Sequence, residues 1–430
     1  MMPRRPRILL LARSFPPTEN IASVRTKNIA KHLSRLGWHV TVVTVDPRLL
    51  VDPGDEAGTR QLLACEGIER ITTRHRLGNL VPGFVRVGLL GSLRPVAGLT
   101  RLLGRWLDVD SGYGWIRPVL KSCRRLQPGD VDVIVASGPP YASFVAAEVL
   151  AKRLQCPFAL DYRDPWTQSS YRWNRPRARS FRAERRLVAG CSLITTVSPN
   201  LAEGFKQVFG VGEKVHVLTN GFDPEDLEGI RPTTFDHFAL VYAGSFDPPP
   251  RVVTPLLRAI KLARAKAGSM SPMRFHYYGR QSKHVIAEAH RLGVDQMIVD
   301  HGQVSRAEAL SAVKGAGAVA VVTSVLEDSA HDARGIVTGK VFEALGLGAP
   351  ILLVAPEGSD AAAIVEGTGG GRRSSASDVA GMASFLEAAR AGRWTKREGA
   401  TAAYEWPNLA RQLDQELRRV VARGANLNRA

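Results

Sequence analysis

Short apolar runs alternate along the chain with longer stretches in which apolar residues recur at helical spacing. In the first half, six runs rich in Val, Ile and Leu predict strands: RILLLAR, HVTVVTV, VDVIVAS, PFALDYRD, LITTVS and VHVLTN. These runs alternate little between apolar and polar positions, which is typical of parallel strands buried on both faces. Helical stretches such as 22–36 and 143–154 lie between them, so we expect crossover helices there.

The same pattern restarts after residue 220, with the runs FALVYAG, RFHYYG, MIVDHG, VAVVT and PILLVAP. Two successive series of strands and helices predict an α/β protein with two facing Rossmann-like doubly wound domains, and 430 residues are more than one core usually serves. We place the first domain at 1–220 and the second at 221–405, with a hinge in 220–235. A polar C-terminal helix and tail should follow at 406–430.

Ligands of such sheets bind beyond the carboxyl ends of the strands, so the loops there are the candidate sites. One loop leads into a helix predicted from Thr338, within RGIVTGKVFEALGLGAP. Lys340 lies in the first turn, where the helix dipole disfavours a cation, and Glu343 follows it in the less favourable order for a pair. A bound anion at the free N–H groups of 336–340 would account for this order. The alternative is a solvated lysine with a surface pair.

This loop resembles a P-loop only in part. Three residues separate Gly335 from Gly339 where a P-loop has four, and Val341 stands where a Ser or Thr would hold magnesium. The sequence therefore indicates phosphate binding without ATPase chemistry. We expect no metal ion at the site.

The composition indicates what class of protein this is and what kind of partner it binds. With 44% hydrophobic and 23% charged residues the chain is an ordinary globular protein, and its formal charge of +18 suggests an anionic partner. The basic residues are spread out and no aromatic stacking motif accompanies them, which argues against nucleic acid. The four cysteines form no CxxC pair, so neither a zinc site nor a disulfide framework is indicated, and we expect a cytoplasmic protein. No apolar run is long enough for a signal peptide or a spanning helix.

The segment 80–107 has the pattern of a basic amphipathic element, which Pro95 divides into two pieces. On a helix, four arginines would lie on one side and Leu, Val and Trp side chains on the other: Arg86, Arg94, Arg101 and Arg105. Such an element is typical of peripheral attachment to an anionic membrane surface, here the inner face of the cell membrane. The alternative is a helix packed on its own domain with solvated arginines.

Several stretches, in order, resemble the family 4 glycosyltransferases of the GT-B fold. They are RILLLARSFPPTENIASVRTKNIAKHLSRLGWHVTVVT, DVIVASGPPYASFVAAEVLAKRLQCPFALDYRDPW, TTVSPNLAEGF, VLTNGFDPEDL, LVYAGSF and TGKVFEALGLGAPIL. The resemblance implies a nucleotide-sugar donor on the second domain and a saccharide or lipid-linked acceptor on the first. It also implies retention of the anomeric configuration and no cofactor. A subset with RDPW and a Lys-x-x-Glu helix acts in cell-surface polysaccharide assembly.

The resemblance also assigns residues by position. Arg163 and Asp164 fall on the family's His-Asp pair, whereas Arg251 and Lys340 resemble the cations that hold the diphosphate. Those four are the catalytic candidates, and Glu343 resembles the glutamate that binds the donor ribose. The other candidates for donor binding are Gly339, Thr338, Val337, Gly244, Ser245, Arg280, Val304 and Asn20.

Three departures from the family pattern keep other functions open. Gly335 replaces the glutamate eight residues before Glu343, the first loop TENIAS has no glycine, and SFDPPPR changes the spacing that leads to Arg251. One alternative is a sugar-nucleotide epimerase of the same fold, which would need acid and base groups in the site. Another is a non-catalytic, transferase-like partner subunit.

Overall fold

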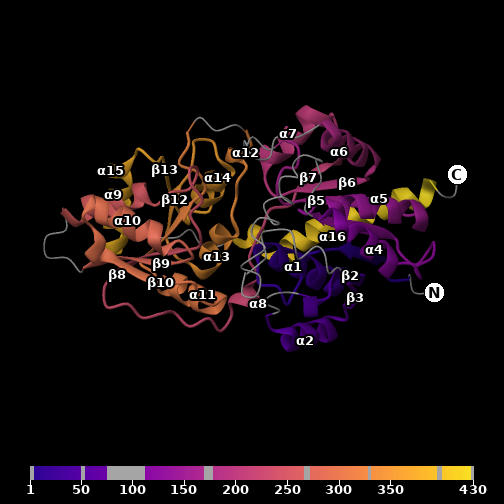
Figure 1. The fold of residues 1–430 in the computed structure, drawn as a ribbon, viewed down its shortest axis with the longest axis horizontal. Coiled ribbons are helices and arrows are strands. Elements are labelled where there is room, and N and C mark those ends of the chain that lie inside the picture. The colour runs from indigo at the N-terminus through magenta and orange to yellow at the C-terminus, as the bar shows by residue number, and fades with distance from the viewer. Residues whose placement is uncertain are drawn as a thin grey trace, which may run out of the picture. The chain divides into compact units, whose positions relative to one another are not determined.

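The computed structural model describes residues 4–49, 54–74, 112–168, 178–265, 272–327, 331–394 and 400–427. The predicted membrane segment, 80–107, lies outside these ranges. The chain divides into two compact units, which are described separately (Figure 1). The first unit is Met1–Thr219 with Trp406–Ala430, and the second unit is Asn220–Glu405.

The first unit is built on a parallel sheet of seven strands in the order β3-β2-β1-β4-β5-β6-β7. The order reverses between β1 and β4, which is the switch point at which doubly wound sheets bind ligands. The strands are β1 (Arg7–Leu11), β2 (His39–Val45), β3 (Glu69–Thr73), β4 (Val133–Gly138), β5 (Phe158–Tyr162), β6 (Leu193–Thr196) and β7 (Val215–Val217).

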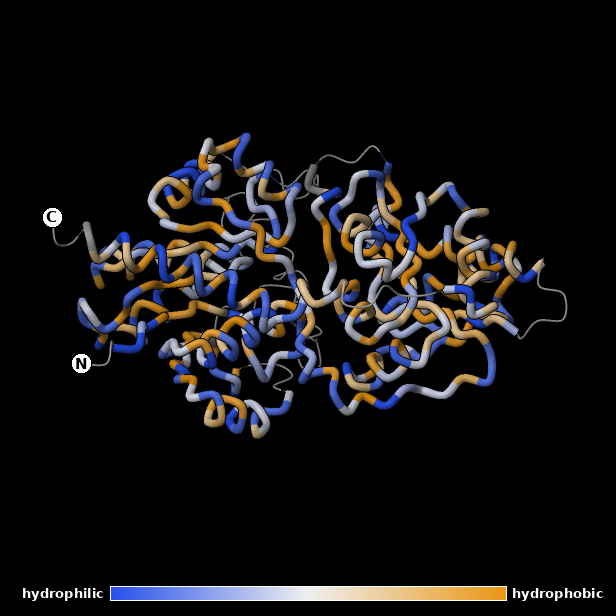
Figure 2. Tube along the Cα trace, turned by 180° about the vertical axis from the view of Figure 1, so that it is seen from behind, coloured by the Kyte–Doolittle hydropathy of each residue, from blue (hydrophilic) through white to orange (hydrophobic). Residues whose placement is uncertain are grey.

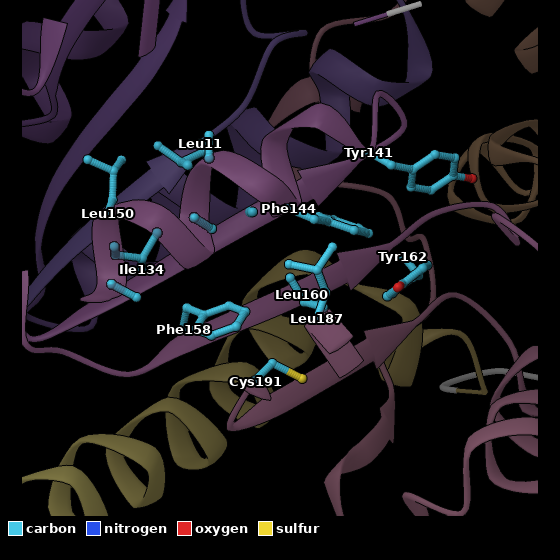
Figure 3. Packing of buried hydrophobic residues seen from close by; sticks show 14 of the residues in the cluster. Leu11, Ile134, Tyr141, Phe144, Leu150, Phe158, Leu160, Tyr162, Leu187 and Cys191 are labelled. Atoms are coloured by element: carbon cyan, nitrogen blue, oxygen red, sulfur yellow. The ribbon is translucent and has the colours of Figure 1, made fainter. Parts of the chain in front are cut away.

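Helices cover both faces of this sheet, because alternate strand residues point to opposite sides. Leu9 and Leu11 of β1 belong to one apolar cluster, whereas Ile8 and Leu10 belong to the other. The first cluster is shown in Figure 3 and is covered by α4 (Ile116–Ser122), α5 (Ala142–Leu154), α6 (Ala178–Gly190) and α7 (Pro199–Phe209). The second is covered by α1 (Ile21–Arg35), α2 (Glu56–Glu66) and α16 (Trp406–Leu427).

The C-terminal helix α16 is part of the first unit, although we predicted 406–430 as a separate helix and tail. Leu409, Leu413 and Leu417 recur at intervals of four and are buried in the same cluster as α1. The indole of Trp38 donates a hydrogen bond to Asp414 at 2.6 Å. The apolar stripe therefore docks α16 on the sheet of the first unit.

The second unit repeats this architecture with a parallel sheet of six strands in the order β10-β9-β8-β11-β12-β13. Its strands are β8 (Phe238–Ala243), β9 (Met273–Tyr278), β10 (Ile298–Gly302), β11 (Ala318–Val322), β12 (Ile351–Val354) and β13 (Gly371–Ser374). Figure 2 colours the chain by hydropathy, and hydrophobic stretches occur in both units. The prediction of two Rossmann-like α/β domains is confirmed.

The helices of the second unit also pack against two apolar clusters, one on each face of the sheet. One face carries α9 (Thr254–Ala265), α10 (Ser282–Leu292) and α15 (Val379–Arg390). The other carries α8 (Pro224–Leu227), α11 (Arg306–Gly315), α13 (Gly339–Leu347) and α14 (Asp360–Gly367); the short α12 (His331–Arg334) precedes α13. None of the helices that the structure describes is long and apolar enough to cross a bilayer.

Candidate functional site

The predicted anion site at the start of α13 is present as a helix N-terminus. Thr338 is the N-cap residue with an extended backbone, but its side chain makes no capping hydrogen bond. The Thr338 hydroxyl is buried and has no hydrogen-bond partner among the residues that the structure describes. The first N–H groups of a helix lack intrahelical acceptors, so this end of α13 offers several donors to a ligand.

Lys340 lies in the first turn of α13 and is half-buried. Its Nζ lies 5.0 Å from the centroid of the Tyr242 ring, and within the described residues it forms neither an ion pair nor a hydrogen bond. Burial lowers the pKa of Lys340 to about 8, and the nearby positive charge of Arg251 lowers it further. An anion next to Nζ would remove this penalty, which is the outcome expected of a phosphate-binding lysine.

Gly244 allows Lys340 to occupy this position. It follows β8 directly with a φ of +143°, and an added Cβ would lie 1.6 Å from Lys340 Nζ. Its N–H donates to the carbonyl of Tyr278 at 2.7 Å, which fixes the loop against the end of β9. Ser245 accepts a 3.1 Å hydrogen bond from the Tyr242 hydroxyl on its carbonyl oxygen. The structure therefore brings the candidate Lys340 next to Gly244, which lies far from it in the sequence.

Arg251, the second predicted cation, is close enough to Lys340 to affect its pKa. Its guanidinium forms an ion pair with Asp247, four residues earlier in the same loop. The Asp247 carboxylate is 60% exposed, so the pair can rearrange when a ligand arrives. Arg251 therefore brings less net charge to the site than Lys340 does.

Glu343 lies one turn beyond Lys340 on α13 and is held by a partner that the sequence did not suggest. Its Oε1 accepts a hydrogen bond of 2.7 Å from Arg306, the first residue of α11. Because β10 precedes α11, this ion pair joins the loop after β10 to α13. Val304 in that loop packs against the apolar cluster that also contains Val337. Arg280, which follows β9, is exposed.

The catalytic candidates of the first unit follow β5. The N–H of Arg163 donates to the carbonyl of Gly138 at 3.0 Å, and its guanidinium donates to the carbonyl of Pro139. Burial lowers the pKa of this guanidinium, with the charge of Asp164 opposing the shift. Asp164 is exposed, and its carbonyl accepts a hydrogen bond from the Tyr141 hydroxyl at 3.1 Å.

A buried ion pair beside this position was not predicted. Arg25 of α1 donates to Asp161 of β5 at 2.7 Å, and both side chains are almost fully buried. Arg25 also donates to the carbonyls of Leu218 and Thr219, so α1, β5 and the end of the first unit are tied together. Asn20, predicted as a donor contact, caps α1 by accepting from the Ser23 N–H at 2.8 Å.

Three histidines form a second polar cluster in the second unit. His276 Nε2 lies 2.7 Å from His237 Nε2, and its Nδ1 lies 2.9 Å from His301 Nε2. The His301 ring stacks on Tyr278 at 4.1 Å. Burial lowers the pKa of His276 to about 4, and the neighbouring histidines add to the shift. Across the described ranges no group of three or more His, Cys, Asp or Glu is placed to hold a metal ion.

Comparison with known proteins identifies one domain in the first half of the chain and solved structures with a similar fold. Residues 22–221 match the model of the glycosyl transferase 4-like domain. Sucrose-phosphate synthase from Thermosynechococcus elongatus is a solved structure with a similar fold, at a TM-score of 0.61 and 14% identity over 97% of this chain and all of that one. The Anabaena protein HepE in complex with UDP and glucose has a TM-score of 0.55 and 17% identity, with 98% of each chain covered.

A glycosyltransferase from Rickettsia africae is also similar, with a TM-score of 0.57 and 13% identity over 97% of this chain and 99% of that one. No curated protein sequence matches the chain. At these identities the solved structures show the fold alone, and the family model describes residues 22–221 alone. This chain therefore contains a glycosyl transferase 4-like domain at residues 22–221 and has the two-domain Rossmann-like fold of these solved structures.

Proposed function

We propose that this chain transfers a sugar from a nucleoside diphosphate sugar to an acceptor, with retention of the anomeric configuration. The observation that carries the proposal is the half-buried ammonium of Lys340 at the N-terminus of α13, which forms no ion pair within the described residues. A diphosphate supplies the missing negative charge and accepts from the helix N–H groups. HepE, with the same fold, was solved with UDP and glucose, which supports this choice of donor class.

The chemistry needs the charge that the second unit provides. When the bond between the sugar and the phosphate breaks, negative charge grows on the departing diphosphate. Lys340, the start of α13 and Arg251 then stabilise the leaving group, and a fixed cation does so without reorganising solvent. The Glu343 carboxylate, oriented by Arg306, accepts hydrogen bonds from the ribose hydroxyls. No metal ion is required for these roles.

The first unit contributes the acceptor side in this proposal. The exposed carboxylate of Asp164 orients an acceptor hydroxyl or stabilises positive charge on the sugar, and Arg163 holds the loop in place through its two hydrogen bonds. The acceptor is a saccharide or a lipid-linked saccharide of the kind used in cell-surface polysaccharide assembly. The enzyme would then work in the cytoplasm at the inner face of the membrane.

The test is the release of nucleotide from UDP-, GDP- and dTDP-sugars with and without simple glycoside acceptors. We compare the wild type with Lys340→Ala and with Lys283→Ala, which removes an exposed lysine of α10 in the same unit. Removing one contact to a leaving group typically lowers turnover about 10²–10³-fold. We expect that loss for Lys340→Ala only, and a product with the anomeric configuration of the donor by NMR.

The other outcomes separate the alternatives. Conversion of the donor into an isomeric nucleotide sugar would identify an epimerase. Donor binding without hydrolysis or transfer for any donor would indicate a non-catalytic partner subunit. Equal turnover in Lys340→Ala and the wild type would remove Lys340 from the reaction.

A further inference from the structure

The positive charge of this protein belongs almost entirely to one unit. The first unit, Met1–Thr219 with Trp406–Ala430, contains 38 Lys and Arg against 19 Asp and Glu. The second unit, Asn220–Glu405, contains 20 against 21. A nucleotide site in the second unit therefore does not account for the charge. A large charge on one unit alone indicates an anionic partner for that unit.

Within the first unit, exposed cations gather on the outer surface of α4, α5 and α6. The helix α5 contacts both α4 and α6, and the three lie together in Figure 1. We call this surface the basic face, and its exposed cations are Arg117, Lys121, Arg124 and Arg125 on and just after α4, Lys152 and Arg153 on α5, and Arg179, Arg182, Arg185 and Arg186 on α6.

The pattern on α6 shows how the sequence produces this face. Arg179, Arg182 and Arg186 recur at intervals of three and four and are exposed, with Arg185 beside them. The opposite side of the helix carries Leu187 and Val188, which are buried in the apolar core of the unit. The arginines therefore stand in a row along the solvent side of the helix.

Few carboxylates compensate these charges. The described parts of α4, α5 and α6 contain two acidic residues, Glu148 and Glu184. Glu184 is fully buried and accepts from Thr167, so it does not reach the surface. Glu148 is 7% exposed and pairs with Lys152 at 3.0 Å and Arg186 at 2.9 Å. The remaining cations of the basic face are turned to water with no acidic side chain from these helices.

We propose that the basic face docks the enzyme on an anionic lipid bilayer. The cations are spread over three adjacent helices, which suits an extended polyanionic surface better than a single small anion. Val149 of α5, a large apolar side chain that is 42% exposed, lies among them and can enter the interfacial region. None of the large hydrophobic side chains exposed in the described residues is aromatic, so a platform for nucleobases is missing there.

The basic face is separate from the site of transfer. It lies on the outer sides of helices, whereas the catalytic candidates Arg163 and Asp164 follow the carboxyl end of β5. Docking would hold the enzyme where a lipid-linked acceptor is concentrated, and the basic face would take no part in the reaction. The docking experiment needs no sugar nucleotide, so its result is independent of the proposed transfer.

The experiment is sedimentation of the full-length protein with vesicles of phosphatidylcholine alone or with about one third phosphatidylglycerol. One variant combines Arg179→Gln, Arg182→Gln and Arg185→Gln, which leaves the Arg186–Glu148 pair intact. The matched control combines Arg258→Gln, Arg264→Gln and Arg393→Gln, three exposed arginines of the second unit. Both variants lose the same charge, so they differ only in its location.

We expect the wild type and the control to bind the anionic vesicles and the α6 variant to bind about 100-fold more weakly. That factor follows from a factor of about five for each basic residue near an anionic membrane. Salt should weaken the binding, because the charges are exposed. Melting temperature checks that both variants are folded.

Equal binding to neutral vesicles, equal losses in the two variants, or no vesicle binding by the wild type would overturn the proposal. A 30-nucleotide DNA is tested at the same salt concentration. Binding of the DNA through the α6 arginines in the absence of vesicle binding would assign the face to a nucleic acid instead.

Discussion

The buried charge of Lys340 makes an unusual prediction about stability. Replacing it by Met keeps the length and apolar stem of the side chain and removes the charge. The folded state lowers the pKa of Lys340 from 10.5 to about 8. Because one pKa unit corresponds to about 1.4 kcal/mol, keeping the ammonium charged at pH 7 destabilises the ligand-free second unit by roughly 3 kcal/mol. Lys340→Met should therefore stabilise that unit.

The pH dependence of the stability tests the sign of this effect. Between about pH 8 and pH 10.5 the unfolded chain binds the Lys340 proton and the folded chain does not, so the wild type becomes more stable as pH rises through this window. The advantage of the Lys340→Met variant should be full at pH 7 and vanish near pH 10.5. Below pH 8 both states of the wild type are protonated, and the advantage should stay constant there.

Hydrogen exchange of peptides from β8 and α13 reports the opening free energy of the second unit alone. It is measured on ligand-free protein at several pH values, with Lys283→Met, an exposed position on α10, as the control. Lys283→Met should change the opening free energy little. A Lys340→Met variant that is no more stable than the wild type at pH 7, or a difference that does not depend on pH, would refute a Lys340 charge that the folded state destabilises.

Three further predictions concern the second unit. Glu343→Gln should weaken nucleotide binding about tenfold by calorimetry and leave the fold intact, because the hydroxyl acceptor loses its charge; unchanged affinity would exclude Glu343 from the site. Gly244→Ala should weaken nucleoside diphosphate binding about as much as Lys340→Ala does, because its Cβ would lie 1.6 Å from Lys340 Nζ and displace the ammonium; normal affinity would contradict the packing. The second unit should lose up to roughly 3 kcal/mol as pH falls from 6.5 to about 4, because protonation of His276 favours the unfolded chain. His276→Gln should lack this loss in urea titrations. If the variant loses as much unfolding free energy as the wild type over this pH range, another group causes the loss.

Central strands could be predicted from the sequence because they are buried on both faces and are therefore continuously apolar. One edge strand of each sheet was missed for the converse reason. Glu69–Thr73 lies at an edge of the first sheet and Gly371–Ser374 at an edge of the second, and both carry charged residues because one side meets solvent. Hydropathy gives no signal at such positions, so neither strand was among the predicted ones.

Sequence motifs identified segments that contain candidate site residues. They could not predict the contacts between segments that are distant in the sequence. The order of Lys340 and Glu343 on α13 indicated a bound anion. The partners that shape the site, Gly244 against Lys340 and Arg306 against Glu343, come from other strand ends and become neighbours only through the sheet order. The Arg25–Asp161 pair joins residues 136 positions apart. No local spacing contains that information.

The most direct test of the central claim compares a nucleoside diphosphate with its monophosphate by calorimetric titration. If Lys340 and the start of α13 hold the second phosphate, the wild type should bind UDP, GDP or dTDP at least tenfold more tightly than the matching monophosphate. In Lys340→Ala that preference should shrink to a factor of a few, whereas Lys283→Ala should keep it. Equal affinity of the wild type for the two nucleotides, or an unchanged preference in Lys340→Ala, would contradict a diphosphate site at Lys340.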